Sequence, residues 1–401
     1  MKLKLELVTE QTRLDEHCRA WREASRFAFD TEFIRDDTYD AKLCLVQVSA
    51  NGEVVLIDPT AELDLSPFWK LVTDESVQTV VHAGKEDFEV CLRATGLPPS
   101  NVFDVQIAAG IVGFGYPLSL ARLVNAALRQ RIAKGQTLTN WLKRPLTEEQ
   151  LRYAVEDVKY LPAIYDILQE RLEKTGRESW AREEFAQLED PAAYARPVQQ
   201  RIFKLKGSKK LDGLGLAVLS RLVEWRDRWA QEKNRPPRAL VRDDILVSIA
   251  KRRPTSAREL EVLRGFPQSQ KSSVVREMLQ IINEGAATPR EECPEAFIPR
   301  EETPMMKVAI SVLSALMRSI CHEEEVAHDL VGSTQRLREL LDFQLGEISE
   351  HPALLIGWRE QFIGRRLVDL LEGRCELHLS GWPKHLRLDV VNHPARKASN
   401  P

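Results

Sequence analysis

The chain has 401 residues, 43% hydrophobic and 29% charged, which is the composition of a globular protein large enough for two to four domains. Its 57 Lys and Arg against 60 Asp and Glu give a formal net charge of −3, so a polycationic protein of the histone kind is excluded. The N-terminal residues alternate charged and apolar side chains, and no run approaches the ~20 apolar residues that cross a membrane. Six scattered cysteines without a CxxC pair argue against a zinc site or a disulfide framework and favour the cytoplasm.

The first part of the chain mixes strand and helix patterns. Runs of β-branched and aromatic residues predict strands at 26–33, 42–49, 51–59 and 77–83. A helix is expected directly after the fourth strand, from Lys85 to Gly96. Thr147 and Gln150 have the spacing of a capping box and predict the start of one long helix that ends near residue 176. This order predicts an α/β domain with a mixed sheet.

The remainder of the chain has helical periodicity. Apolar residues recur at helical spacing in residues 214–230, and three further helical runs are expected at 305–327, 333–345 and 356–373. Two proline-containing segments without periodicity, around residues 188–207 and 284–304, are predicted linkers. We therefore predict an α/β domain followed by two small all-α domains, with these boundaries: 1–195, 205–287 and 304–388.

Positive charge is concentrated in the middle of the chain. Residues 196–253 contain sixteen Lys and Arg against six Asp and Glu, on an otherwise acidic protein. Such a segment is typical of a module that binds phosphates, although a solvated basic helix face has the same composition.

Two acidic residues on the first predicted strand indicate chemistry. Asp30 and Glu32 are two positions apart, so both carboxylates point to one face of the sheet, within a run of phenylalanines where the pattern favours apolar burial. Burying like charges without a partner is costly. A hard divalent cation such as Mg²⁺ or Mn²⁺ would compensate them.

Three more residues complete the hypothesis. Asp87 lies in the first turn of the helix after the fourth strand, and Tyr153 and Asp157 are four apart on one face of a later helix. Taken singly, each acid has an ordinary explanation, as a helix N-terminal acid or a solvated helix acid. Together they could hold two cations for displacement at phosphorus, with the Tyr153 hydroxyl positioning the attacking water.

These residues carry a family resemblance. Residues 30–49, 80–90 and 134–161 resemble, in order and spacing, the three exonuclease motifs of the ribonuclease D family, which belongs to the DEDD superfamily of 3′–5′ exonucleases. The resemblance implies an RNase H-like fold and assigns a catalytic tyrosine, Tyr153, of the tyrosine subgroup. It also implies four metal-binding catalytic acids: Asp30, Glu32, Asp87 and Asp157. It allows substrate contacts by Thr31, Phe33 and His82, although His82 could equally be structural, and Asp104 is expected to be a helix N-cap.

The resemblance extends into the helical parts. Residues 211–254 resemble the helicase-and-ribonuclease-D C-terminal (HRDC) domain, and residues 354–373 resemble a second, divergent copy. Trp225, Trp229 and Trp358 fall on helical stripes and are expected in the core rather than on a base-stacking surface. The expected nucleic-acid contacts within the basic segment are Lys209, Lys210, Arg226, Arg235, Arg238, Lys251 and Arg252.

The resulting expectation is a monomeric 3′–5′ exoribonuclease that uses two Mg²⁺ or Mn²⁺ ions, releases nucleoside 5′-monophosphates and trims the 3′ ends of tRNA precursors and other structured RNAs. Neither zinc nor a membrane is expected as a partner. Three alternatives stay open: an exonuclease acting on single-stranded DNA ends, a non-catalytic RNA-binding adaptor, and a metal hydrolase of small phosphates. The last does not explain the basic helical segment, and the adaptor predicts a lost acid where all four are present.

Overall fold

The chain folds into two compact units. The first comprises residues 1–32, 44–193 and 302–401, and the second comprises residues 33–43 and 194–301. The structure, a computed structural model, describes these residues: 4–34, 38–132, 140–195, 197–263, 265–266, 272–297, 303–384 and 386–392.

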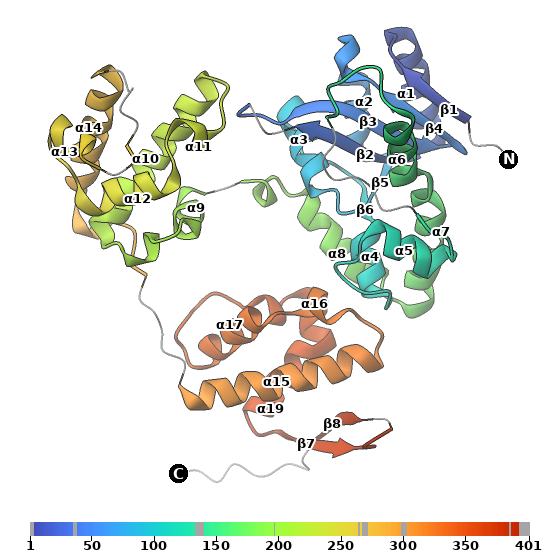
Figure 1. The fold of residues 1–401 in the computed structure, drawn as a ribbon. Helices are drawn as coiled ribbons and strands as arrows, with labels where there is room; N and C mark the ends of the chain where they lie inside the picture. The colour runs from blue at the N-terminus through green and yellow to red at the C-terminus, as the bar shows by residue number, and fades with distance from the viewer. Residues whose placement is uncertain are drawn as a thin grey trace. The chain divides into compact units, whose positions relative to one another are not determined.

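A six-stranded mixed sheet forms the centre of the first unit, as the strand pattern predicts (Figure 1). The strand order is β1-β4-β3-β2-β5-β6, in which β3 and β4 are antiparallel, whereas β1 is parallel to β4 and β5 is parallel to both β2 and β6. Strands β1 and β6 add to the four that the sequence predicts. The strands span Lys4–Val8, Arg26–Ile34, Lys42–Ala50, Glu53–Ile57, Gln78–Val81 and Val102–Asp104.

One face of the sheet is closed by an aromatic core. Phe27 and Phe29 on β2 are fully buried and lie against Phe68, and the rings of Trp21 and Phe88 complete the cluster. Because side chains alternate along a strand, Asp30 and Glu32 point away from this core, to the other face. The helices that contribute to the aromatic core are α1 (Gln11–Ala24), α2 (Ser66–Val72) and α3 (Lys85–Thr95).

The predicted long helix is two helices. The capping box of Thr147 and Gln150 is present and begins α6 (Glu148–Lys159), but the chain turns at Tyr160 and continues as α7 (Leu161–Thr175). Pro162 explains the break, because its ring lacks an N–H and would clash with the carbonyl four residues earlier. The other helices of this part are α4 (Val105–Ile111), α5 (Leu120–Leu128) and α8 (Glu178–Glu189).

The C-terminal part belongs to the first unit. It is mainly helical, but it also carries a hairpin of two antiparallel strands that the prediction of an all-α domain missed. The six residues of β7 alternate apolar with polar side chains, the period of a strand, so a local signal for this strand was present in the sequence. Its elements are α15 (Pro304–Glu323), α16 (His328–Val331), α17 (Thr334–Gln344), α18 (Gly357–Arg359), a π-helical turn (Glu360–Gly364), α19 (Arg365–Leu371), β7 (Cys375–Ser380) and β8 (Arg387–Asn392).

Helix α15 is long and apolar enough to cross a membrane by length and composition, in contrast to the expectation from sequence. Only 28% of its most apolar stretch is buried. Leu313, Leu316 and Met317 lie inside the unit, and α15 packs against α16 and α17. One helix that meets the criteria of length and composition is weak evidence for a membrane span.

The C-terminal part is fixed to α8 by a buried ion pair. Arg359 donates to both carboxylate oxygens of Glu184, at 2.6 and 3.0 Å, and both side chains are 7% exposed. The indole of Trp358 donates to the same carboxylate at 2.8 Å, and its ring stacks on Trp180. On α4, the Gly110 carbonyl accepts from the Ala327 N–H at 2.7 Å. The C-terminal part is therefore built onto the sheet-containing part.

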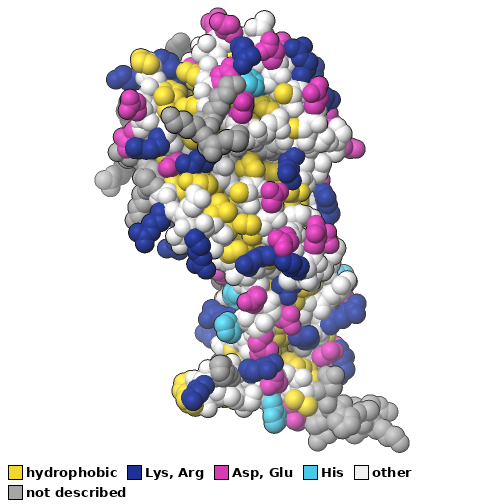
Figure 2. Space-filling view, turned by 90° about the vertical axis from the view of Figure 1, so that its right-hand side faces the viewer, with side chains coloured by type: hydrophobic (Ala, Val, Ile, Leu, Met, Phe, Trp, Pro, Cys, Tyr) yellow, Lys and Arg dark blue, Asp and Glu magenta, His cyan; other side chains and the backbone are white. Residues whose placement is uncertain are grey.

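The second unit is helical around its own core. Trp225 is buried within that core and stacks on Trp229, as expected from their helical spacing. On the face of the whole molecule that Figure 2 shows, basic and acidic side chains are interspersed, in keeping with the small net charge of the chain. The helices are α9 (Val198–Lys204), α10 (Gly213–Glu232), α11 (Pro237–Leu240), α12 (Asp243–Arg252), α13 (Ala257–Glu261) and α14 (Ser272–Ala286).

Candidate active site

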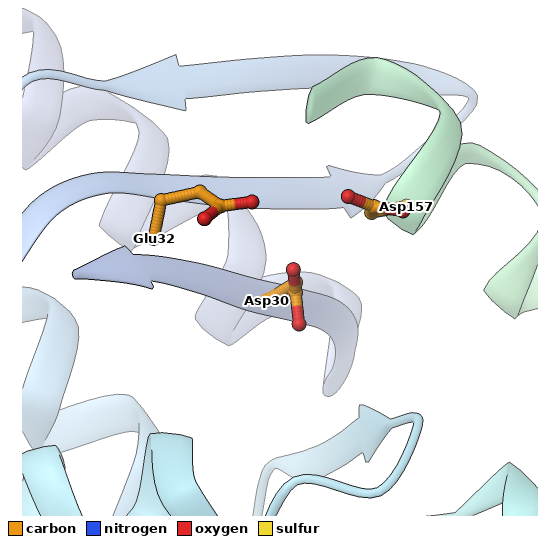
Figure 3. Close-up of side chains that lie close together, drawn as sticks. All are labelled: Asp30, Glu32 and Asp157. Atoms are coloured by element: carbon orange, nitrogen blue, oxygen red, sulfur yellow. The ribbon is translucent and has the colours of Figure 1, made fainter. Parts of the chain in front are cut away.

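Three of the four predicted acids form one cluster. Asp30 and Glu32 project from β2 toward Asp157 on α6, and each offers an oxygen within 4.8 Å of the others (Figure 3). The strand and the helix come together because α6 crosses the sheet face opposite the aromatic core. The sequence expectation that these residues converge is met for this trio.

The fourth acid, Asp87, lies beside the trio but outside it. It is 6% exposed in the first turn of α3, where its carboxylate accepts a hydrogen bond from the buried hydroxyl of Thr31. Thr31 therefore orients an acid, and this placement gives no support to its expected contact with substrate. Phe33 is half-buried, and its contact with substrate stays a prediction.

The turn that carries Asp87 is held by Asp104. The Asp104 carboxylate accepts from the N–H groups of Ala83 and Gly84, at 3.1 and 3.2 Å. It also caps α4 through Gln106, as the sequence analysis expects. Sequence reasoning missed the first set of contacts, because a helix cap is visible as a local pattern and a partner twenty residues away is not. His82 precedes this turn, and its Nε2 lies 2.9 Å from the carbonyl oxygen of Leu118, which supports a structural role.

Burial without compensating cations raises the pKa of every acid in the cluster. Desolvation, reinforced by the neighbouring carboxylates, raises the pKa of Asp30 well above its usual range and that of Glu32 to about 8. Burial also raises the pKa of Asp87 and that of Asp157 to about 7, although hydrogen bonds from Thr31 and Tyr153 oppose the increase. The folded protein therefore pays an electrostatic penalty to keep four carboxylates together.

Tyr153 completes the site from the same helix face as Asp157, and their side chains are hydrogen-bonded. Its ring packs against Trp141, with ring centroids 6.0 Å apart. Burial and the nearby carboxylates raise the pKa of the phenol, so Tyr153 stays protonated at neutral pH. A protonated phenol suits positioning by hydrogen bonding rather than removal of a proton.

The residues of the cluster fit a hard divalent cation. Their donor atoms are all carboxylate oxygens, and Oδ2 of Asp157 is buried without a hydrogen-bond partner among the described residues. A buried acceptor of this kind costs free energy unless a ligand satisfies it. Asp30, Glu32 and Asp157 are the residues that would hold the ion, with Asp87 nearby.

The structure corrects one of the predicted nucleic-acid contacts. Arg226 is 4% exposed, and its guanidinium donates to the Val241 carbonyl at 2.7 Å and to Asp243 at 2.8 Å. It is a core residue, because its position on α10 faces inward among apolar neighbours. Arg238 is exposed but paired with Asp243, and Lys209 lies over the ring of Phe297. The remaining predicted contacts are exposed: Lys210, Arg235, Lys251 and Arg252.

The second unit also has a basic groove that sequence reasoning found only in part. The groove has a volume of about 430 Å³, and its lining combines four cations with two acids. Basic residues from α9, from the loop after it and from around α11 meet there, which composition counts could not show. We call this the α9–α11 groove; its charged lining residues are Lys204, Lys206, Arg238, Arg242, Asp243 and Asp244.

Comparison with known proteins agrees with this geometry. Residues 5–173 match the family model described as 3′-5′ exonuclease, and residues 215–282 match the model of the HRDC domain. The chain is 32% identical to ribonuclease D of Bartonella henselae, over 94% of this chain and 92% of that protein. It is 34% identical to ribonuclease D of Sphingobium indicum, over 92% and 95% of the two chains.

A solved structure extends the likeness to the whole fold. The crystal structure of Escherichia coli RNase D, described as an exoribonuclease involved in structured RNA processing, superposes with a TM-score of 0.79 at 28% identity. The match covers 93% of this chain and 99% of that chain. The half-buried carboxylate cluster, the two family models and these relatives together place the chain in the ribonuclease D family of 3′–5′ exoribonucleases.

Proposed function

We propose that this enzyme trims the 3′ ends of structured RNAs, tRNA precursors among them, and releases nucleoside 5′-monophosphates. The observation that carries the proposal is the half-buried cluster of Asp30, Glu32 and Asp157, whose oxygens lie within 4.8 Å of one another. The structured-RNA activity stated for the E. coli relative supports the choice of substrate. The specific substrate and product are our own inference.

We propose that the carboxylates bind two Mg²⁺ or Mn²⁺ ions. When bound, such ions supply an activated water and stabilise the leaving 3′-oxygen of an in-line displacement. The protein's part is to hold Asp30, Glu32 and Asp157 around one point, to keep Asp87 oriented through Thr31, and to place the Tyr153 hydroxyl beside Asp157. The phenol would then hydrogen-bond the attacking water without taking its proton, in accordance with its raised pKa.

The α9–α11 groove is our proposed RNA contact in the second unit, together with the exposed cations of the predicted set. Phosphate oxygens would pair with Lys204 and Lys206, whereas the two arginines of the groove, Arg238 and Arg242, are already paired with Asp243 and Asp244. We further propose that the protein is a cytoplasmic monomer. The six free cysteines of the described structure support the reducing compartment.

A digestion assay tests the function. A hairpin RNA with a 3′ extension, labelled at its 5′ end, is incubated with Mg²⁺ or Mn²⁺ and the wild type, Asp30→Asn, or Asp166→Asn. Asp166 is an exposed acid on α7 and serves as the matched control. We expect a ladder that shortens from the 3′ end with the wild type and Asp166→Asn, and no ladder with Asp30→Asn. A DNA hairpin of the same sequence should be cut weakly.

Two outcomes would overturn the proposal. Equal or better cutting of DNA would identify an exonuclease of DNA ends. Binding of RNA without product under either metal would identify an RNA-binding adaptor. Chromatography of the released material distinguishes 5′-monophosphates from longer fragments.

A further inference from the structure

We propose that Arg144 is a positioning residue for the active-site helix α6: it fastens the segment before this helix to β3 and to the end of β4 and so sets the position of Tyr153. The proposal deepens the function above, because it rests on the assignment of Tyr153 and Asp157 to the active site.

The guanidinium of Arg144 has no donor left for a phosphate. Its Nε and Nη2 donate to the two carboxylate oxygens of Asp58, at 2.5 and 2.6 Å. The second hydrogen of Nη2 bonds the Cys44 carbonyl at 2.8 Å, and Nη1 bonds the carbonyls of Trp141 and Lys143, at 2.7 and 3.2 Å. A guanidinium has five N–H donors, and all five are used inside the protein.

The partner of Arg144 is itself rigidly held. Asp58 directly follows β4 and is 4% exposed. Its backbone N–H bonds the Val8 carbonyl of β1 at 3.0 Å, and its carboxylate accepts from the N–H and hydroxyl of Thr60, at 2.9 and 2.6 Å. Burial opposes ionisation of this carboxyl, but the bonds from Arg144 and Thr60 prevail and lower its pKa. The anchor therefore stays charged at neutral pH.

On the side away from Asp58, Arg144 is connected through Trp141 to the phenol of Tyr153. Arg144 holds the Trp141 carbonyl, and the Trp141 ring packs on Tyr153. The same segment is tied to α6 at a second point, because the Gln150 amide donates to the Asn140 carbonyl at 3.3 Å. A path of direct contacts thus runs from the ends of β3 and β4, through Arg144 and Trp141, to Tyr153. Small displacements of reacting groups lower rates strongly, so this path bears on catalysis.

A contact with RNA phosphate would dismantle this arrangement. The phosphate would replace bonds to Asp58, and a buried carboxylate without its partner is strongly destabilising. Lysine could not substitute for Arg144 either, because an ammonium is a point charge without the planar fork that joins one carboxylate and three carbonyls.

The test measures kcat, KM, RNA affinity at several salt concentrations, and the melting temperature for Arg144→Ala, Arg144→Lys, Asp58→Asn and the double variant Arg144→Ala/Asp58→Asn. Arg13→Ala is the matched control, because Arg13 also pairs with carboxylates, those of Glu6 and Glu16, but on the exposed surface of α1. We expect kcat to fall roughly 10–100-fold in each Arg144 variant, with KM and the salt dependence of RNA affinity unchanged.

Two further readouts separate positioning from a general loss of stability. Added guanidinium ion should restore part of the kcat of Arg144→Ala and none of the kcat of Arg144→Lys, whose side chain occupies the space. The double variant should lose no more kcat than Arg144→Ala alone, because both changes break the same connection. Arg13→Ala should retain wild-type kcat.

Three results would overturn the proposal. A raised KM with a weaker salt dependence of RNA affinity would show that Arg144 contacts phosphate. A lowered melting temperature with wild-type kcat below that temperature would show a purely structural role. Additive losses in the double variant would show that Arg144 and Asp58 act independently. Failure of the site assignment would be recognised separately, because Asp30→Asn would then keep its activity.

Discussion

The first unit buries carboxylates in two opposite ways. Glu184 on α8 meets a bidentate arginine and an indole N–H, so its charge is compensated from the C-terminal part of the chain. Asp157 on α6 meets Asp30 and Glu32 instead, and one of its oxygens has no partner among the described residues. Both acids accept a hydrogen bond from an aromatic side chain: Glu184 from Trp358 in the C-terminal part, and Asp157 from Tyr153 on its own helix.

This difference distinguishes a carboxylate with a structural role from carboxylates that are suited to binding a ligand. A compensated buried charge joins two parts of the fold, and nothing about it calls for a ligand. An uncompensated cluster costs stability, and the divalent cations that we propose for it would account for its presence on a strand and a helix face. Asp58 belongs to the first kind and shows that a compensated acid can still serve the site indirectly.

Breaking the compensated pair should have the largest effect. Arg359→Ala leaves Glu184 buried without its partner, and we expect the free energy of unfolding to fall by about 3–5 kcal/mol. Cleavage measured well below the melting temperature should be close to wild type, because Arg359 touches no residue of the cluster among the contacts described. Chemical denaturation followed by tryptophan fluorescence measures the loss.

The matched control is Arg22→Ala, which removes the exposed pair with Asp74 and should change stability little. If Arg359→Ala unfolds like the wild type, the ion pair does not hold the C-terminal part in place. If it is stable but inactive, the pair affects the site directly and the contrast drawn above fails.

Removing the aromatic hydrogen-bond donor from each of the two carboxylate sites tests whether the sites have different roles. Tyr153→Phe deletes the hydroxyl that bonds Asp157, and we expect kcat to fall roughly 10–100-fold, the worth of one hydrogen bond to a charged group. Trp358→Phe deletes the equivalent donor to Glu184 and should lower the melting temperature with kcat retained. Steady-state digestion and thermal melts of both variants provide the measurement. A loss of kcat in both, or in neither, would contradict the division of roles.

The acids of the cluster could be predicted from sequence. The compensated pair of Glu184 and Arg359 could not, because it depends on contacts between residues far apart in the chain. Asp30 and Glu32 are predictable because the strand pattern places charges where apolar residues are expected, and Asp157 because the family motifs fix its order and spacing. The pairing of Glu184 with Arg359 is not, since the two residues are 175 positions apart and each looks like a solvated helix residue. Arg226 was misassigned for the same reason: composition counts a charge without showing that it points inward.

The prediction of the fold also succeeded for local patterns and failed for long-range pairing. Strands with alternating or apolar β-branched residues and the capped start of α6 were predicted, whereas β1 and the C-terminal hairpin were not. In β1 the alternation of lysine, glutamate and leucine suits an edge strand as well as a solvated segment. Only pairing with β4, nearly fifty residues away, decides between them. Long-range pairing is the information that a local pattern lacks.

The smallest effect we expect concerns protons at the uncompensated cluster. Burial raises the pKa of Asp87 and of Asp157 to about 7 and that of Glu32 to about 8, from unfolded values of roughly 4. The folded protein therefore holds more protons than the unfolded chain between these values. The contribution of these bound protons to the stability of the folded state is complete below about pH 4, and it is lost as the pH rises through 7 to 8.

Divalent cations compete with these protons, so their stabilising effect should grow as the protons leave. We expect saturating Mg²⁺ to raise the melting temperature by a few degrees at about pH 8.5 and hardly at all at about pH 5.5. Asp157→Asn should flatten this difference, because it removes both a metal ligand and a titrating group, whereas Glu184→Gln should preserve the difference at a lower overall stability. An increment from Mg²⁺ that is the same at both pH values would mean that the cluster is already ionised in the metal-free protein. The electrostatic penalty that distinguishes it from Glu184 would then be absent.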